Sequence, residues 1–211
     1  MPGPHVVEVC LFPAKEGYQN DPKVMHDAFS YIYKVATGLN YIYHGFQTED
    51  KNNGYFFLSW ATYQDHKKLM DDTELYPPLI SKIVPHLAGP LDMVHVEFKT
   101  DPLKSFKAPA TEIAIIKPKS PEQKAQVLEL MKELEKRLNE APYEQSCAWG
   151  QGIEEGKQDT IVLVVGWDSV QDHWDQVDQS KGYQPLVSVV QKAFQVADLD
   201  VKHARLIRYS P

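Results

Sequence analysis

Residues 60–66 read WATYQDH and residues 167–173 read WDSVQDH, so tryptophan, glutamine, aspartate and histidine recur in the same order. The two stretches lie 107 positions apart, and the same interval separates Tyr76 from Tyr183. A fixed period of this length is typical of two copies of one small domain. The 211-residue chain is therefore predicted to hold a first half over residues 1–103 and a second half over residues 104–211.

Both halves show the same succession of strand and helix patterns. Alternating or β-branched runs predict strands, helical spacing of apolar residues predicts helices, and Asn53-Gly54 is a hairpin signal. We expect strands at 6–12, 41–47, 55–60 and 93–98 with helices at 24–35 and 62–87, and in the second half strands at 112–116, 146–153, 160–167 and 201–209 with helices at 121–138 and 169–194.

The order β-α-β-β-α-β, used twice, predicts the fold class. It is α+β, with two ferredoxin-like repeats that each carry an antiparallel four-stranded sheet and both helices on one face. The other face of each sheet has no predicted cover, and an uncovered apolar face must find a partner. We therefore expect the two sheets to pack face to face as one intramolecular α/β barrel.

Composition limits the classes of partner. The chain is 43% hydrophobic with a formal net charge of −7, which disfavours nucleic acid and anionic membranes because both attract basic surfaces. Only two cysteines are present, Cys10 and Cys147, and the first residues do not form a secretory signal. A cytoplasmic location without membrane insertion is expected, and the sequence leaves homodimer formation open.

Alternation along the strands sorts side chains into two faces. Val7, Val9 and Leu11 form an apolar set that we expect against the helices, which would leave Glu8 with Cys10 facing the space between the sheets. Such buried charge needs a partner or water. One interpretation is internal salt bridges, such as Glu112 with Arg205. The other is a polar-lined cavity that holds a ligand.

Histidine and tyrosine are the candidates for catalysis. Imidazole transfers protons near neutral pH, and a phenol can donate a hydrogen bond to a developing oxyanion. The structural alternative is that the helix histidines pack on a neighbouring strand and that the tyrosines anchor a helix break. The candidate catalytic residues are His66, His95, His173, His203, Tyr76 and Tyr183.

Aromatic and polar side chains near the strand ends are the candidates for ligand binding. The two tryptophans can serve as stacking platforms or as core aromatics. The first half is richer in such groups on its second strand. The candidate ligand-binding residues are Trp60, Trp167, Tyr43, His44, Phe46 and Glu8. The chain has no Gly-rich phosphate loop, His-Glu-x-x-His or Cys-x-x-Cys motif, so we expect no metal and no cofactor.

The repeated motif Trp-x4-Asp-His-x9-Tyr-x2-Leu resembles the dimeric α/β-barrel superfamily. More narrowly, it is similar to the antibiotic-biosynthesis-monooxygenase and stress-responsive barrel domains in their fused tandem form from fungi. The resemblance covers about residues 6–98 and 110–209. Its haem-degrading branch is disfavoured, because Glu8 or Glu112 stands where that branch has asparagine on the first strand.

The resemblance and the candidate residues together imply a function. We expect a small-molecule enzyme of secondary metabolism, acting without cofactor on a phenolic, polyketide-like or other apolar substrate. A histidine in the barrel cavity would transfer a proton, and the outcome would be cyclisation, isomerisation, lyase chemistry or oxygenation. The alternative is a non-catalytic small-molecule-binding or stress-response barrel, because fold alone does not imply catalysis.

Overall fold

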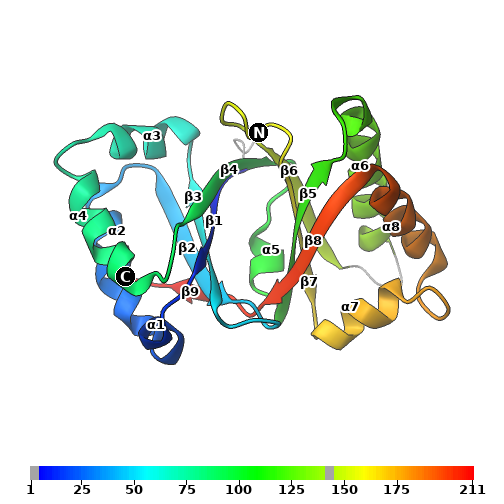
Figure 1. The fold of residues 1–211 in the computed structure, drawn as a ribbon, viewed down its shortest axis with the longest axis horizontal. Coiled ribbons are helices and arrows are strands. Elements are labelled where there is room, and N and C mark those ends of the chain that lie inside the picture. Colours follow the sequence, from blue (N-terminus) through cyan, green and yellow to red (C-terminus); the bar gives the residue numbers. More distant parts are fainter. Residues whose placement is uncertain (1–4, 141–144) are drawn as a thin grey trace. The chain divides into compact units, whose positions relative to one another are not determined.

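The computed structural model describes residues 5–140 and 145–211, which divide into two compact units (Figure 1). Unit 1 runs to Glu97 and also takes in Leu206–Pro211, whereas unit 2 is Phe98–Arg205. Each unit is a ferredoxin-like repeat, so the α+β class and the duplicated β-α-β-β-α-β order are confirmed. None of the helices in the described ranges is long and apolar enough to cross a membrane.

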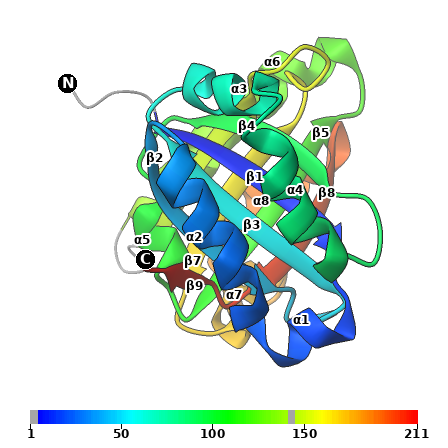
Figure 2. The same ribbon diagram turned by 90° about the vertical axis from the view of Figure 1, so that its left-hand side faces the viewer.

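The sheet of unit 1 has the strand order β4-β1-β3-β2-β9. Strands β1 and β3 pair antiparallel, as do β3 and β2. Figure 2 shows helices α2 and α4 covering one face of this sheet. The elements are β1 (His5–Pro13), α1 (Glu16–Asn20), α2 (His26–Val35), β2 (Leu39–Phe46), β3 (Asn53–Trp60), α3 (Tyr63–Asp71), α4 (Tyr76–Ile83), β4 (Asp92–Phe98) and, from the chain end, β9 (Ile207–Tyr209).

The sheet of unit 2 repeats the order as β8-β5-β7-β6. Its core lies between the sheet and the two long helices, with Val127, Met131, Leu134 and Leu138 on the buried stripe of α6 as the spacing predicted. The elements are α5 (Leu103–Phe106), β5 (Ala110–Pro118), α6 (Lys124–Asn139), β6 (Ser146–Gly152), β7 (Ile161–Trp167), α7 (Val170–Val177), α8 (Gln184–Val196) and β8 (Ala197–Ala204).

The repeated motif contains the N-cap of the helix that follows the third strand of each unit. The Thr62 hydroxyl accepts a hydrogen bond from the backbone N–H of Asp65 at 3.2 Å and donates one to its carboxylate at 2.7 Å. Ser169 and Asp172 make the same pair of contacts at 3.1 and 2.6 Å. These caps satisfy backbone N–H groups at the first turn and fix where the next histidine points.

Two sequence expectations about the strands were wrong. The run at 201–209 is two strands, β8 and β9, and β9 pairs with β2 of unit 1. Asn53-Gly54 does not form the hairpin turn, because Gly54 lies within β3 opposite Phe12 and Phe46. A Cβ on Gly54 would sit 2.5 Å from the Phe12 ring, so close packing rather than turn geometry requires glycine there.

Candidate functional site

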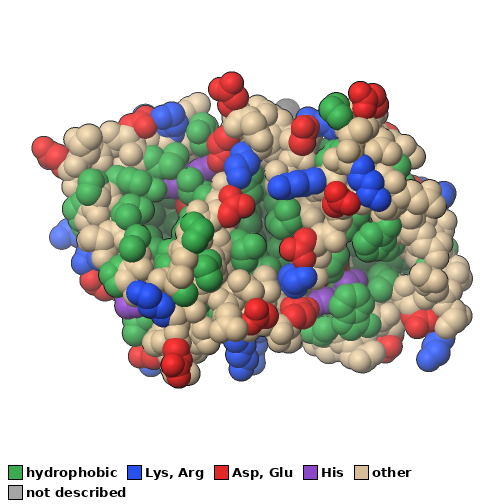
Figure 3. Space-filling model, viewed as in Figure 1, with side chains coloured by type: hydrophobic (Ala, Val, Ile, Leu, Met, Phe, Trp, Pro, Cys, Tyr) green, Lys and Arg blue, Asp and Glu red, His purple; other side chains and the backbone are tan. Residues whose placement is uncertain are grey.

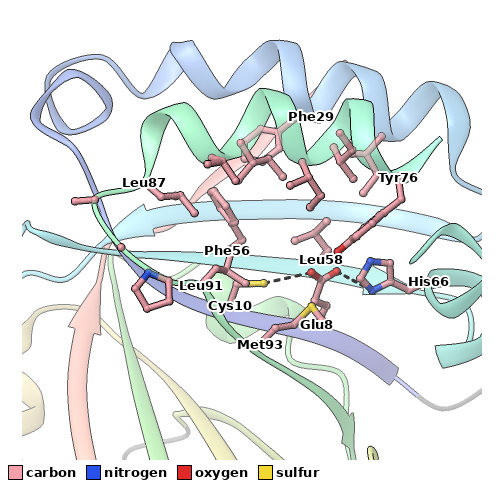
Figure 4. A pocket seen from close by; sticks show the side chains of 18 of the residues that line it. Glu8, Cys10, Phe29, Phe56, Leu58, His66, Tyr76, Leu87, Leu91 and Met93 are labelled. Carbon is pink, nitrogen blue, oxygen red and sulfur yellow. Dashed lines mark hydrogen bonds and ion pairs between the residues drawn. The ribbon is translucent and has the colours of Figure 1, made fainter. Parts of the chain in front are cut away.

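A cavity of about 540 Å³ lies in unit 1 between the sheet and its helices. Its wall is mostly apolar and is built from β1, β3, β4, α2, α4 and the loop that follows α4 (Figure 4). Figure 3 shows apolar side chains gathered around a hollow over this unit. The polar lining residues are Glu8, Cys10, Lys15, His66 and Tyr76.

The centre of the polar end is the carboxylate of Glu8, only 6% exposed. The indole N–H of Trp60 donates a hydrogen bond to Glu8 Oε2 at 3.1 Å, and the Cys10 thiol donates to Oε1 at 3.2 Å. Burial, followed by the nearby charge of Glu8, raises the pKa of Cys10 well above its ordinary value. The thiol is therefore protonated and acts as a donor.

His66 extends the cluster from α3. Its Nδ1 lies 3.2 Å from Glu8 Oε2 and 2.6 Å from Nε2 of His95, which comes from β4. The Trp60 ring stacks on the His66 ring with centroids 4.5 Å apart and an interplanar angle of 8°. His66 and His95 are 2% and 0% exposed. Trp60 thus fixes both the carboxylate and the imidazole.

Tyr76 stands at the start of α4 and lines the cavity near this cluster, as Figure 4 shows. Burial raises the pKa of Tyr76 to about 12, and the nearby charge of Glu8 contributes further. The phenol therefore keeps its proton at neutral pH and can act only as a neutral hydrogen-bonding group. The cavity combines a carboxylate, an imidazole and a phenol at one end of an apolar space.

The expected assignment of strand faces was wrong. Glu8 and Cys10 line a cavity together with Phe29 of α2 and Leu79 of α4, so their face of β1 looks toward the helices (Figure 4). In unit 2, Ala114, from the Glu112 face of β5, belongs likewise to the core beneath the helices. Alternation identifies which residues share a face, but both faces carry apolar residues, so it did not identify the helix side.

The suggested salt bridge between Glu112 and Arg205 is also absent from the contacts of these two described residues. Arg205 is exposed, whereas the Glu112 carboxylate accepts a hydrogen bond from the indole N–H of Trp167 at 2.8 Å. The neutral indole N–H of Trp167 therefore takes the place that we expected the Arg205 guanidinium to hold.

Of the six predicted ligand-binding residues only Glu8 lines the cavity. Trp60 and Trp167 instead hold Glu8 and Glu112 through their indole N–H groups. His44 is buried behind the lining residue Phe29, with ring centroids 5.0 Å apart, and its Nδ1 lies 3.0 Å from the Tyr18 hydroxyl. Burial lowers the pKa of His44 to about 4, so this ring is neutral. Phe46 packs edge-on against Tyr18, and Tyr43 packs edge-on against Tyr41.

Unit 2 repeats the cluster with different geometry. His173 places Nδ1 2.8 Å from His203 Nε2, whereas its Nε2 lies 3.5 Å from Glu112 Oε2. The two nitrogens of His173 therefore face two different neighbours. Trp174 stacks on His173 with centroids 4.6 Å apart, and Tyr183 caps the start of α8 beside the core. Three of the residues predicted in the second half, Trp167, His173 and His203, gather around Glu112. The fourth, Tyr183, packs on the core.

The corresponding cavity positions of unit 2 are packed together. Leu163, Val165 and Leu186 stand where Phe56, Leu58 and Leu79 line the cavity of unit 1, and they belong to one buried core. Helix α8 also continues to Val196 and leads directly into β8. Helix α4 ends at Ile83 and is followed by a short 3-10 helix (Val84–His86) and a loop before β4. The shorter helix and its loop open the space in unit 1.

Sequence reasoning missed three features of the site. Cys10 was placed on the same strand face as Glu8 but was not selected as a site residue, and the loop over residues 87–91 had no recognisable signal. The third is that donor atoms of Glu8, His66 and His95 all lie within 4.8 Å of one another, a spacing that suits a metal ion. These residues come from three separate elements, so no short sequence pattern announces them.

The fold has counterparts among solved structures. No protein-family model and no curated protein matches the chain. A structure named "Putative monooxygenase" from Fusobacterium nucleatum aligns over 100% of both chains with a TM-score of 0.68 and 11% identity. An anthrone oxidase-like protein aligns over 96% of this chain and 91% of its own, with a TM-score of 0.68 and 13% identity.

A second structure named "Putative monooxygenase", from Lactobacillus acidophilus, covers 97% of this chain and 94% of its own at a TM-score of 0.65 and 8% identity. At these identities the likeness concerns the fold. Along nearly its whole length, the chain shares the α/β fold of these monooxygenase-type and anthrone oxidase-like structures.

Proposed function

We propose that the unit 1 cavity is the active site of a cofactor-independent oxygenase that removes a proton from an apolar small molecule. The observation that carries this proposal is the His66 imidazole at the polar end of an apolar cavity, 3.2 Å from the buried carboxylate of Glu8. A buried carboxylate beside an imidazole stabilises the imidazolium that forms when the ring accepts a proton.

The lining supports an apolar substrate. Apart from the polar end and Lys15, the wall consists of aliphatic and aromatic side chains and loop backbone. A volume of about 540 Å³ lies within the range of small-molecule sites. A phenolic or polyketide-like molecule would place its reacting carbon next to His66 and its rings against residues such as Phe29 and Phe56.

Tyr76 supports the next step. When His66 removes a proton from carbon beside a carbonyl, negative charge moves to the carbonyl oxygen. A phenol that keeps its proton can donate a hydrogen bond to that oxygen, and burial strengthens the contact. In this assignment His66 is the base, Glu8 supports it and Tyr76 holds the oxyanion.

The oxygen step needs no external reductant. The carbanion supplies the electrons to O₂, one oxygen atom becomes a new carbonyl and the other leaves as water, so a CH₂ group and O₂ give C=O and H₂O. The names of the neighbouring structures, monooxygenase and anthrone oxidase-like, agree with this outcome. Isomerisation or cyclisation would begin with the same proton removal and end without O₂.

The first experiment follows the proton. Apolar phenols and ketones are incubated with the protein in D₂O without O₂, and deuterium uptake at carbon is measured by mass spectrometry. We expect uptake with the wild type and a loss of about 10²- to 10⁴-fold in His66→Asn, the range of general-base catalysis. Under O₂, the same compounds should consume O₂ and gain a carbonyl.

The matched control is His173→Asn, the corresponding change in unit 2, which should keep full activity. Compounds that bind with measurable affinity but exchange no deuterium would contradict the proposal and favour the binding or stress-response alternative. Equal losses in the two histidine variants would also contradict it, because the cavity of the proposal lies in unit 1 and the corresponding described positions of unit 2 are packed together.

A further inference from the structure

Glu8, His66 and His95 bring three lone-pair donors to one point from three different elements. They stand on β1, α3 and β4, and their ligand atoms lie within 4.8 Å of one another. Two imidazole nitrogens and a carboxylate oxygen are a ligand set that binds Zn²⁺ and other divalent transition metals.

We propose that these three residues form a binding site for one divalent transition-metal ion of the zinc class. Glu8 and His66 also line the cavity, so a coordination position would face the space where the substrate of the proposed reaction binds. Three protein ligands and one open position is the arrangement of exchangeable rather than closed structural zinc sites.

The present distances are close to those that a metal requires. Bonds of about 2.0–2.2 Å put two ligands of a tetrahedral ion about 3.4 Å apart. His66 Nδ1 lies 3.2 Å from Glu8 Oε2 and 2.6 Å from His95 Nε2. The pair of Glu8 and His66 needs almost no change, and the two imidazoles must separate by less than 1 Å. The ligand atoms of Glu8 and His95 lie within 4.8 Å of each other and must settle at the same spacing of about 3.4 Å.

The surrounding residues suit a metal site as well. Ligating carboxylates are themselves held by hydrogen bonds, and Trp60 donates one to Glu8 at 3.1 Å. The same indole stacks on the His66 ring and fixes its plane (interplanar angle 8°). Trp60 therefore holds two of the three ligands in place for an ion.

Unit 2 is not expected to bind a metal in this way. His173 faces His203 with Nδ1 and Glu112 with Nε2, so its two contacts leave from opposite edges of the ring. A single ion cannot occupy both edges. The proposal therefore specifies one ion per chain, although both units contain the same three residue types.

Metal binding would regulate the proposed reaction. An imidazole that ligates an ion through one nitrogen carries its proton on the other, so it has no lone pair left to accept a substrate proton. The ion should act as a reversible inhibitor of the deuterium exchange. This inhibition rests on the proposed function, whereas the binding of the metal does not.

Equilibrium dialysis of the metal-free protein against Zn²⁺ tests the site. We expect one ion per chain, with affinity at least about 100-fold weaker in Glu8→Gln, His66→Asn and His95→Asn, and about 10- to 100-fold weaker in Trp60→Phe. The matched variants Glu112→Gln, His173→Asn and His203→Asn should bind as the wild type does. Two ions per chain, or binding unaffected by the unit 1 substitutions, would overturn the proposal.

Co²⁺ provides a readout that needs no variant to fold. Its visible spectrum should report nitrogen and oxygen ligands in a four- or five-coordinate site, and the imidazole NMR signals of His66 and His95 should broaden before those of His173 and His203. Simultaneous broadening of all four would contradict the site. Zinc binding without any deuterium exchange would reject only the proposed function, and exchange without zinc binding would reject only the metal site.

Discussion

The indole N–H of Trp60 donates a hydrogen bond to the buried carboxylate of Glu8 at 3.1 Å, across two strands that pair antiparallel. The same contact joins Trp167 to Glu112 at 2.8 Å in the second unit. A buried carboxylate costs free energy unless its oxygens have donors, so the repeated tryptophan stabilises the repeated glutamate. This contact explains why both residues recur at corresponding positions.

Removing the Trp60 donor should destabilise unit 1. We expect Trp60→Phe to lower the free energy of unfolding by about 1–3 kcal/mol, because Glu8 Oε2 loses a partner while it stays buried. Urea unfolding of the wild type, both single variants and the Trp60→Phe/Glu8→Gln double variant separates this contact from lost packing. Strictly additive effects would show that the two side chains are not coupled.

Glu112 should make stability depend on pH. Burial raises its pKa from 4.5 to about 7, against the opposing effects of the Trp167 hydrogen bond and the His203 charge. A carboxyl group with a higher pKa in the folded chain holds its proton more tightly there. Its contribution to the free energy of unfolding is therefore complete below pH 4.5 and is lost as the pH rises toward 7.

The measurement compares the wild type with Glu112→Gln. Between pH 4.5 and 7 the wild type should lose stability relative to this variant by on the order of 3 kcal/mol, the linkage value for a shift of this size. Glu155→Gln, at an exposed position, is the control and should run parallel to the wild type. A difference between the wild type and Glu112→Gln that stays constant with pH would contradict the raised pKa.

Tyr76 should matter for turnover and not for folding. Tyr76→Phe removes the phenolic donor at the polar end of the cavity, so kcat for the proposed oxygenation should fall by about 10²- to 10³-fold. Thermal unfolding should change little, since the ring remains. Tyr183→Phe is the matched change in unit 2 and should leave kcat unchanged. A rise in KM with kcat unchanged would mean that Tyr76 only binds the substrate.

Gly54 should tolerate no side chain. A Cβ there would lie 2.5 Å from the Phe12 ring, which is itself packed against Phe56 at a centroid distance of 4.3 Å. We expect Gly54→Ala to destabilise the protein by about 1–3 kcal/mol through overpacking. Gly17→Ala, in α1 with open space around it, should be neutral or stabilising. Equal melting temperatures for the two variants would contradict this account.

Much of the fold follows from local patterns. The 107-residue period and the strand and helix spacing predicted two ferredoxin-like repeats, and the structure has both. The hairpin turn was misplaced because the Asn53-Gly54 signal competes with a close contact to Phe12 that no local pattern contains. Strand β9 was missed because its pairing partner, β2, is more than 150 residues away.

The candidate site was predicted only in part. The sequence selected Glu8, His66, His95 and Tyr76 one by one, and the structure places them near one another. It did not predict that they meet on the helix-covered face, nor that His44 and Phe46 lie outside the cavity lining. Face and depth depend on which layer covers a strand, and periodicity carries no information on that choice.

The sequence by itself determined the duplication, the order of elements and the residue types that each unit holds, because repeats, periodicity and caps are local or internally compared properties. Only the tertiary structure decided that unit 1 has a cavity where unit 2 has a packed core. It also decided that His66 contacts Glu8 and His95 through one nitrogen, whereas His173 faces Glu112 and His203 with two. Helix length, side-chain volume and ring orientation depend on segments that are distant in the sequence. The same motif therefore forms a site with a different geometry in each unit.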